Sequence, residues 1–177
     1  MELTEDHSRE EQQDLSWVQI HTRRVLSFFI SPLARAHGWN KLFLISPWIS
    51  DFGLDGGMTF TQILKRLRDD DATLYVVSRP PLENWHKNAL DQIASTGKAN
   101  IALVPELHTK LYCADTDHGT LALVGSANFT ARSLVNREIG VMIRGVGPGK
   151  KLIQNLMYEA SDIYRSVTRD LYCKRKI

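Results

Sequence analysis

Apolar residues recur at roughly helical spacing in four segments of the chain. The first of these segments contains Pro32, which can kink or end a helix. Thr59 suits the cap position of the second, and Pro81 stands in the first turn of the third, where proline is well tolerated. The predicted helices cover residues 15–36, 59–70, 81–96 and 148–168.

Short apolar runs bounded by turn residues predict six strands, at residues 41–46, 72–78, 100–105, 108–114, 120–126 and 137–145. Residues 115–120 have the polar and glycine content of a hairpin turn, and residues 128–135 suit a short helical or turn segment. Strands alternate with helices at first, and three strands then follow close together. This order predicts an α/β fold, a layered domain with a mixed sheet.

The composition is that of a folded domain. With 177 residues, of which 43% are hydrophobic, we expect one domain over residues 15–177 after a polar segment at residues 1–14. The two cysteines, Cys113 and Cys173, are too few for a disulfide framework. We find no apolar run that could span a membrane and no secretory signal, and so expect a soluble, cytoplasmic protein without membrane contact. The net charge of +2 does not by itself indicate nucleic-acid binding.

Two short stretches carry the candidate chemistry: HTKLYCAD at residues 108–115 and GSAN at residues 125–128. In a strand, His108 and Lys110 would point to the same face, about 7 Å apart. A glycine before Ser126 and Asn128 would let the backbone and a ligand approach closely. An imidazole for attack, with an ammonium and neutral donors for the oxygens, suits a phosphate diester.

The spacing of these residues resembles the HKD signature of the phospholipase D superfamily. The signature positions are His108, Lys110, Asp115, Gly125, Ser126 and Asn128. The following GSANFTARSLVNREIGV, with Asn136 and Glu138, is similar to nuclease-like members of that superfamily. Nine residues separate Asp115 from Gly125, more than the family usually has, and a longer hairpin would absorb them. The resemblance implies an α-β-α layered domain with a central mixed β-sheet flanked by helices.

Family members place two such motifs in one active site, where one histidine forms a phosphohistidine and the other protonates the leaving oxygen. This chain has one motif, since WHKN at residues 85–88 lacks the remaining signature positions. The resemblance therefore implies a homodimer in which His108 of each subunit meets across a two-fold axis. It implies neither a metal nor another cofactor, and activity should survive EDTA.

The resemblance also implies roles for the other motif residues. Lys110 and Asn128 would bind phosphate oxygens, and Ser126 would support them. Asp115 belongs to the catalytic motif but would shape it rather than touch substrate. Glu138 either hydrogen-bonds a histidine, which the partner subunit could supply, or is a solvated charge at a strand start. The sequence leaves both readings of Glu138 open.

Substrate contacts are harder to derive from sequence. The basic residues that we expect to contact nucleic acid are Arg79, Lys87, Arg132 and Arg137, with His86 a further candidate. For any one of them a solvated surface position is the commoner explanation. Trp48 and Trp85 suit base stacking, although packing in the core or at its rim is the commoner role of tryptophan.

Three functions fit these features. The favoured one is a metal-independent endonuclease acting on DNA rather than RNA, in restriction or phage defence, with further partner proteins of a defence system. The second is a non-catalytic or partner-dependent nucleic-acid-binding subunit that keeps the fold as a platform. The third is a phospholipid phosphodiesterase or phosphatidyltransferase, which would need an apolar groove or a membrane-binding helix.

Overall fold

The computed structural model describes residues 17–53 and 58–174, with side chains described as far as residue 168. Within these residues, seven strands form one sheet in the order β1-β7-β6-β5-β2-β3-β4. The strands are β1 Val18–His21, β2 Trp39–Ile45, β3 Thr73–Ser78, β4 Ala99–Leu103, β5 Leu111–Thr116, β6 Gly119–Gly125 and β7 Gly140–Arg144. The helices are α2 Val25–Arg35, α3 Phe60–Asp69, α4 Asn84–Ser95, the 3-10 helix η2 Ala131–Leu134, and α5 Pro148–Lys174.

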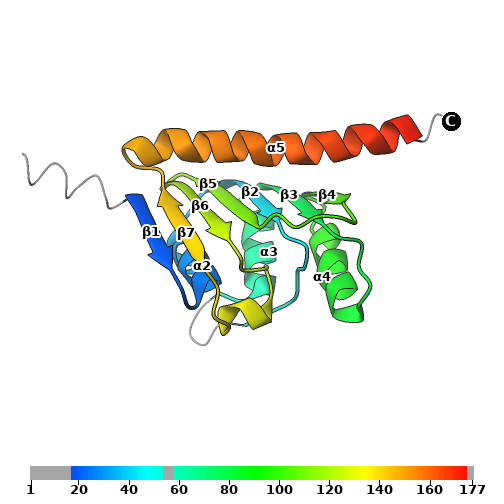
Figure 1. The fold of residues 1–177 in the computed structure, drawn as a ribbon, viewed down its shortest axis with the longest axis horizontal. Coiled ribbons are helices and arrows are strands. Elements are labelled where there is room, and N and C mark those ends of the chain that lie inside the picture. Colours follow the sequence, from blue (N-terminus) through cyan, green and yellow to red (C-terminus); the bar gives the residue numbers. More distant parts are fainter. Residues whose placement is uncertain (1–16, 54–57, 175–177) are drawn as a thin grey trace, which may run out of the picture.

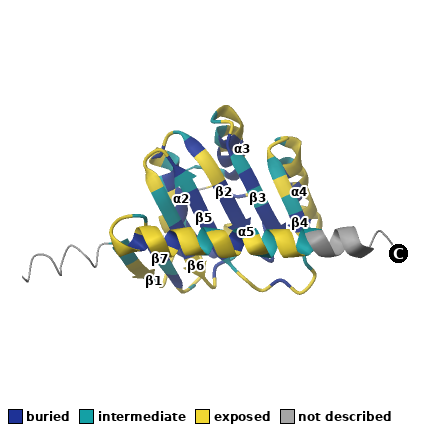
Figure 2. Ribbon diagram, turned by 90° about the horizontal axis from the view of Figure 1, so that it is seen from above, coloured by how far each residue is buried: buried dark blue, intermediate teal, exposed yellow. Residues whose placement is uncertain are grey.

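The sheet is mixed and is covered by helices on both faces, so the predicted α/β layered fold is confirmed. Strands β2, β3 and β4 are parallel, whereas the other neighbours pair antiparallel. Helix α5 lies along one face, and α2, α3 and α4 lie on the other (Figure 1). Viewed from above, α5 runs across the strands, whose central residues are buried (Figure 2).

Strand β2 illustrates why the sequences of the central strands are continuous apolar runs. Leu42 and Leu44 point into the core beneath α2 and α3, whereas Phe43 and Ile45 point into the core beneath α5. A strand buried on both faces needs apolar residues at every position, so the period-two pattern of a half-exposed strand is absent there.

The strand directions bring many strand ends together at one end of the sheet. Ile45 at the end of β2 is paired with Leu111 at the start of β5, and Gly125 at the end of β6 is paired with Gly140 at the start of β7. We call the end of the sheet where β2, β3, β4 and β6 finish, and where β5 and β7 begin, the site end. The opposite end is the far end.

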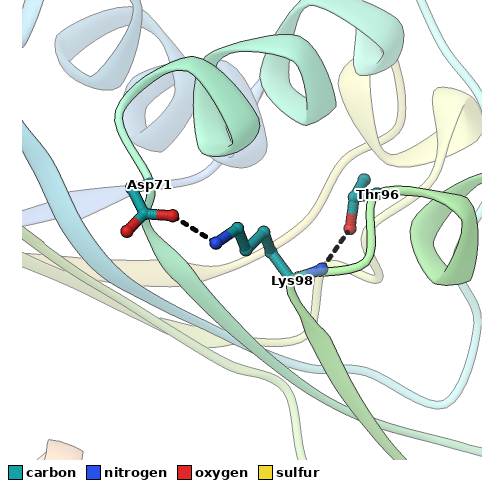
Figure 3. Close-up of polar contacts among 3 residues, drawn as sticks. All are labelled: Asp71, Thr96 and Lys98. Carbon is teal, nitrogen blue, oxygen red and sulfur yellow. Dashed lines mark hydrogen bonds and ion pairs between the residues drawn. The ribbon is translucent and has the colours of Figure 1, made fainter.

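The far end is closed by turns and an exposed ion pair. The Nζ atom of Lys98, in the turn before β4, is paired with Asp71, in the turn before β3, and the backbone N–H of Lys98 donates to Thr96 Oγ1 at 3.2 Å (Figure 3). Both charged side chains are well exposed, so the ion pair contributes little stability. It joins two turns that lie far from the site end.

The predicted helix over residues 15–36 is wrong in its first half. Val18–His21 instead form strand β1, antiparallel to β7, and the helix begins at Val25. Val18 and Val25 lie seven residues apart, which equals two helical turns, so spacing alone could not separate them. Pairing with the exposed edge of β7 decides the outcome. Pro32 does not end the helix, which continues to Arg35. Leu15 lies outside the described residues.

Helix α3 confirms the expected cap. Thr59 Oγ1 accepts a hydrogen bond from the backbone N–H of Gln62 at 3.2 Å, and Gln62 Oε1 accepts one from the N–H of Thr59 at 2.8 Å. This reciprocal pair satisfies two backbone donors of the first turn. Helix α4 begins at Asn84, so Pro81 precedes the helix rather than standing in its first turn.

The fourth predicted strand also begins later than expected. Strand β5 starts at Leu111, so His108 and Lys110 lie in the loop that leads into it and not in the strand itself. The residues between Asp115 and Gly125 lengthen the β5–β6 hairpin, with Thr116 paired with Gly119. As expected, these residues lie in a hairpin, and its turn is at the far end. In the described ranges, no helix combines the length and apolarity needed to cross a membrane.

Candidate active site

Loops at the site end gather most of the motif residues that the sequence analysis selected. His108 and Lys110 precede β5, Ser126 and Asn128 follow β6, and Glu138 precedes β7. Arg79 follows β3 directly and reaches the same place. Residues far apart in sequence therefore meet because β5, β6 and β7 are antiparallel neighbours, with alternate ends at the same end of the sheet.

His108 is exposed, and its ring contacts Arg79. The Nη2 atom of Arg79 lies 2.9 Å from His108 Nε2 and 3.5 Å from Nδ1. A guanidinium group only donates hydrogen bonds, so Nε2 must accept through its lone pair. Arg79 is fixed for this contact because its Nε donates to the carbonyl oxygen of Leu107 at 2.8 Å. The structure thus presents His108 with Arg79 held against its ring nitrogens, nearer to Nε2 than to Nδ1.

Lys110 folds back toward the same loop. Its Nζ donates to the carbonyl oxygen of His108 at 2.8 Å, and its own carbonyl accepts from the N–H of Gly125 at 3.4 Å. The second bond ties the His108 loop to the end of β6. An ammonium carries three donors, so the His108 contact leaves Lys110 able to bind an anion at the same time.

Ser126 and Glu138 join the end of β6 to the start of β7. Ser126 Oγ donates to Glu138 Oε2 at 2.5 Å and accepts from the N–H of Ile139 at 3.0 Å. Ser133 Oγ donates to Glu138 Oε1 at 3.4 Å. Within the described chain, the carboxylate of Glu138 therefore accepts from two hydroxyl groups, whereas the sequence analysis had considered a histidine.

Gly125 is required by the close approach of these two strand ends. A Cβ atom at this position would lie 2.2 Å from the carbonyl oxygen of Ile139 and 2.7 Å from the Cα of Gly140. Both atoms belong to the backbone, which cannot turn aside as a flexible side chain can. The glycine that opens GSAN thus allows β6 and β7 to meet closely enough for Ser126 to reach Glu138.

A buried tyrosine, which the sequence analysis did not select, fixes the GSAN turn from below. The hydroxyl of Tyr112 donates to the carbonyl oxygen of Ala127 at 2.7 Å. Ser46 Oγ, from the end of β2, accepts from the N–H of Phe129 at 3.0 Å and donates to the carbonyl oxygen of Trp48 at 2.8 Å. Burial raises the pKa of Tyr112, so this hydroxyl stays protonated as a donor. A tyrosine among the apolar residues that open strand β5 was the available signal.

Asn128 has unused hydrogen-bonding capacity. Its side chain is half-buried, and Oδ1 is buried without a hydrogen-bond partner among the described residues. Phe129 beside it is buried in the core, which holds the turn in place. A buried polar atom without a partner is unusual in folded proteins. Asn128 is therefore the motif residue whose side-chain acceptor is left unused within the described chain.

Two other candidates, Asp115 and Lys87, are not brought to this place. Asp115 lies in β5 opposite Lys41 and Thr120, about 13 Å along the strand from Leu111 by the rise per residue. Lys87 Nζ is paired with Asp91 on the surface of α4 at 2.5 Å. Arg132 and Arg137 are exposed in the segment between β6 and β7.

His86 is also not available as a basic contact on the surface. Its side chain is fully buried, and Nε2 lies 3.0 Å from Ser78 Oγ. Burial lowers the pKa of His86, which disfavours the charged form. The expectation that His86 is a basic contact is therefore wrong. Among the side chains that the structure describes, no three potential ligands are grouped so as to hold a metal ion.

Comparisons with known proteins agree with this geometry. A family model described as "Cardiolipin synthase, PLD-like domain" matches residues 51–162. A search of curated protein sequences found no significant match.

Among solved structures, Nuc, a phospholipase D family member from Salmonella typhimurium, aligns with a TM-score of 0.57 at 19% identity, covering 82% of this chain and 91% of Nuc. NucT from Helicobacter pylori aligns with a TM-score of 0.56 at 12% identity, covering 86% and 95%. TrmBL2, an archaeal chromatin protein with a novel mode of DNA binding, aligns with a TM-score of 0.56 at 14% identity, covering 90% and 60%. These similarities show a shared fold, and the family model covers more than half of the chain, so the chain belongs to the phospholipase D-like family.

Proposed function

We propose that this protein is a metal-independent phosphodiesterase that cleaves DNA as a homodimer through a phosphohistidine intermediate. The observation that carries the proposal is the contact of Arg79 and Lys110 with His108 at the site end of the sheet, where the loop with Asn128 also lies. Membership in the phospholipase D-like family supports phosphodiester chemistry.

The proposed reaction has two steps at one phosphorus atom. The Nε2 lone pair of His108 attacks phosphorus, a P–N bond forms, and the P–O bond to the leaving strand breaks. His108 of the second subunit donates a proton to the leaving oxygen. That same imidazole then takes a proton from water, whose oxygen attacks phosphorus and releases His108 from the P–N bond. Lys110, Arg79 and Asn128 stabilise the charge on the non-bridging oxygens.

Arg79 has to change partner in this reaction. In the free protein its Nη2 lies on the Nε2 atom that would attack phosphorus. A bound phosphate offers the guanidinium a charged acceptor, which forms a stronger hydrogen bond than a neutral imidazole nitrogen does. Substrate binding would thus move Arg79 onto a phosphate oxygen and release the nucleophile.

A second copy is proposed to supply the missing histidine. Large apolar side chains are exposed near the site end, among them Leu82 at 83%, Val135 at 79% and Ile139 at 63%. Ile139 directly follows Glu138 and so borders the motif. Large apolar side chains that are exposed at one end of a protein favour burial against another surface. The single motif of the chain supports a second copy as that surface.

Nucleic acid is the substrate class that the basic residues favour. Arg79 contacts His108, and the exposed Arg132 and Arg137 lie in the segment that joins β6 to β7 at the same end of the sheet. DNA binding by TrmBL2, which shares this fold, adds support. A cytoplasmic role in restriction or phage defence, with partner proteins, completes the proposal.

One experiment tests the proposal directly. Purified protein is incubated with single-stranded DNA, double-stranded DNA and RNA in EDTA, and His108→Ala is incubated in parallel. Cleavage of DNA by the wild type alone is expected. Activity that disappears on chelation and returns with magnesium would contradict the metal-free mechanism. Gel shift without cleavage by either protein would instead favour a nucleic-acid-binding platform.

A lipid substrate is the second candidate, and the description of the matching family model favours it. In that case the same His108 would attack the phosphodiester of a phospholipid headgroup. Vesicles that contain phosphatidylglycerol, analysed for released headgroup and for cardiolipin, test this candidate. Turnover of these vesicles by the wild type and not by His108→Ala, without any cleavage of nucleic acid, would replace the nuclease proposal.

A further inference from the structure

We propose that Trp85 and Trp48 form a stacking site for an unpaired nucleobase next to the phosphate that His108 attacks. This inference rests on the proposed action on nucleic acid and makes it more specific. The preferred substrate would then be a single strand, in which a base can unstack from its neighbours, and not an intact duplex.

Trp85, Trp48, Arg79 and His108 form a continuous series of contacts. The ring centroids of Trp85 and Trp48 lie 6.2 Å apart. The guanidinium carbon of Arg79 lies 5.5 Å from the centroid of Trp48, and Nη2 of the same arginine lies 2.9 Å from His108 Nε2. One arginine therefore separates the indole of Trp48 from the proposed nucleophile. A base on this surface and a phosphate at His108 would belong to the same short stretch of strand.

The two indole rings are held in place by a buried support. His86 is stacked against Trp85 with centroids 5.6 Å apart and an interplanar angle of 25°, and it meets Trp48 edge-on at 5.5 Å. Its Nε2 contacts Ser78 Oγ at 3.0 Å, and that hydroxyl lies 3.2 Å from the carbonyl oxygen of Pro47. An aromatic surface fixed before binding loses little side-chain freedom when a base stacks on it.

Trp85 is the member of this group that offers a surface. It is 45% exposed although one side of its ring packs on His86, whereas Trp48 is half-buried between Trp85 and Arg79. Proteins that bind single strands place aromatic side chains, on which bases stack, next to positively charged groups that contact phosphates. An indole held in place beside the cationic proposed active site matches this arrangement. In a duplex both faces of each base are already stacked, so this surface would be available only to an unpaired base.

The test measures binding in a His108→Ala background, which separates binding from cleavage. Two labelled ligands of equal length are compared by fluorescence anisotropy: an oligothymidylate and a chain of abasic sugar phosphates. We expect the oligothymidylate to bind about tenfold more tightly, since stacking of each base contributes a factor of roughly 5 to 150. Trp85→Ala should remove most of this difference, and Trp85→Phe should keep part of it.

Tyr158→Ala is the matched control, because Tyr158 is an aromatic residue that is 66% exposed on α5, away from this group. It should leave both affinities unchanged. Equal binding of the two ligands by the Trp85-containing protein would overturn the stacking site and leave the nuclease proposal standing. Failure to bind either ligand would overturn the proposed function itself. If Trp85→Ala instead converted dimer to monomer with base-dependent binding retained, the indole would belong to the dimer interface and the stacking site would be overturned.

Discussion

The guanidinium of Arg79 lies 2.9 Å from Nε2 of His108, so the proposed nucleophile is held by a cation in the free protein. Arg79→Ala would free this nitrogen while removing a phosphate ligand. We expect cleavage to fall about 100-fold, as for the loss of one charge-stabilising donor, and Arg79→Lys to recover only part of it. Steady-state rates on a labelled oligonucleotide measure both effects.

The same variant separates release of His108 from loss of phosphate binding. Acylation of His108 by diethylpyrocarbonate, followed by peptide mass spectrometry, should be faster in Arg79→Ala than in the wild type. The exposed His37 serves as the internal reference. An unchanged rate at His108 would mean that the Arg79 contact does not limit access to its nitrogen.

Glu138 is expected to act mainly on stability within one chain. Glu138→Ala leaves the hydroxyls of Ser126 and Ser133 without their acceptor. A hydrogen bond to a charged group contributes about 1.5–3 kcal/mol, and the long Ser133 bond contributes less, so the free energy of unfolding should fall by at least about 1.5 kcal/mol. Urea denaturation measures the change. Ser133→Ala should cost less, because its bond to Glu138 is the longer one, at 3.4 Å. A larger fall in the free energy of unfolding for Ser133→Ala than for Glu138→Ala would contradict this account.

Gly125→Ala should be poorly tolerated although it adds a single methyl group. The new Cβ would lie 2.2 Å from the carbonyl oxygen of Ile139, and the strand ends would have to separate. Overpacking of this kind costs about 1–3 kcal/mol or more. Gly53→Ala is the matched control, since the nearest atom to its new Cβ among the described residues would be Thr59 Cγ2 at 3.9 Å. Thermal unfolding of the two variants should differ clearly, and equal melting temperatures would show that β6 and β7 can separate at no cost.

Alkaline pH should weaken the fold through its buried acids. Burial raises the pKa of the Cys113 thiol from its ordinary value of 9.0 to about 12. A group with a raised folded pKa contributes stability that is intact below its unfolded pKa and is lost as the pH rises toward the folded pKa. The free energy of unfolding should therefore fall above pH 9.0, and the fall should be smaller in Cys113→Ala. Urea titrations between neutral and alkaline pH measure the free energy of unfolding of both proteins. If Cys113→Ala lost stability with pH as the wild type does, Cys113 would not be the source of the alkaline destabilisation.

Much of the site could be predicted because its residues are close in sequence to strand ends. The HKD spacing placed His108, Lys110, Ser126 and Asn128 together, and the structure brings these residues to one end of the sheet. The Thr59 cap was also correct, because a capping box is a local pattern of four residues.

What the sequence analysis did not predict depends on contacts between distant segments. Arg79, which follows β3, reaches His108 in the loop 29 positions away, and Tyr112 in β5 supports Ala127 in the turn after the neighbouring strand β6. Strand β1 forms because it pairs with the edge of β7, and the residues Val18–His21 alone do not predict that partner. Such contacts follow from strand order, which hydrophobic spacing does not contain.

Because α5 follows every strand of the sheet in the chain, the ribosome makes the whole sheet before it makes α5. Until then, the side chains of Phe43, Ile45 and Val77 on that face have no helix to cover them. During synthesis the nascent chain thus exposes a wide apolar surface of the kind that molecular chaperones bind. Emergence of α5 covers this surface, on the face of the sheet that α2, α3 and α4 leave open.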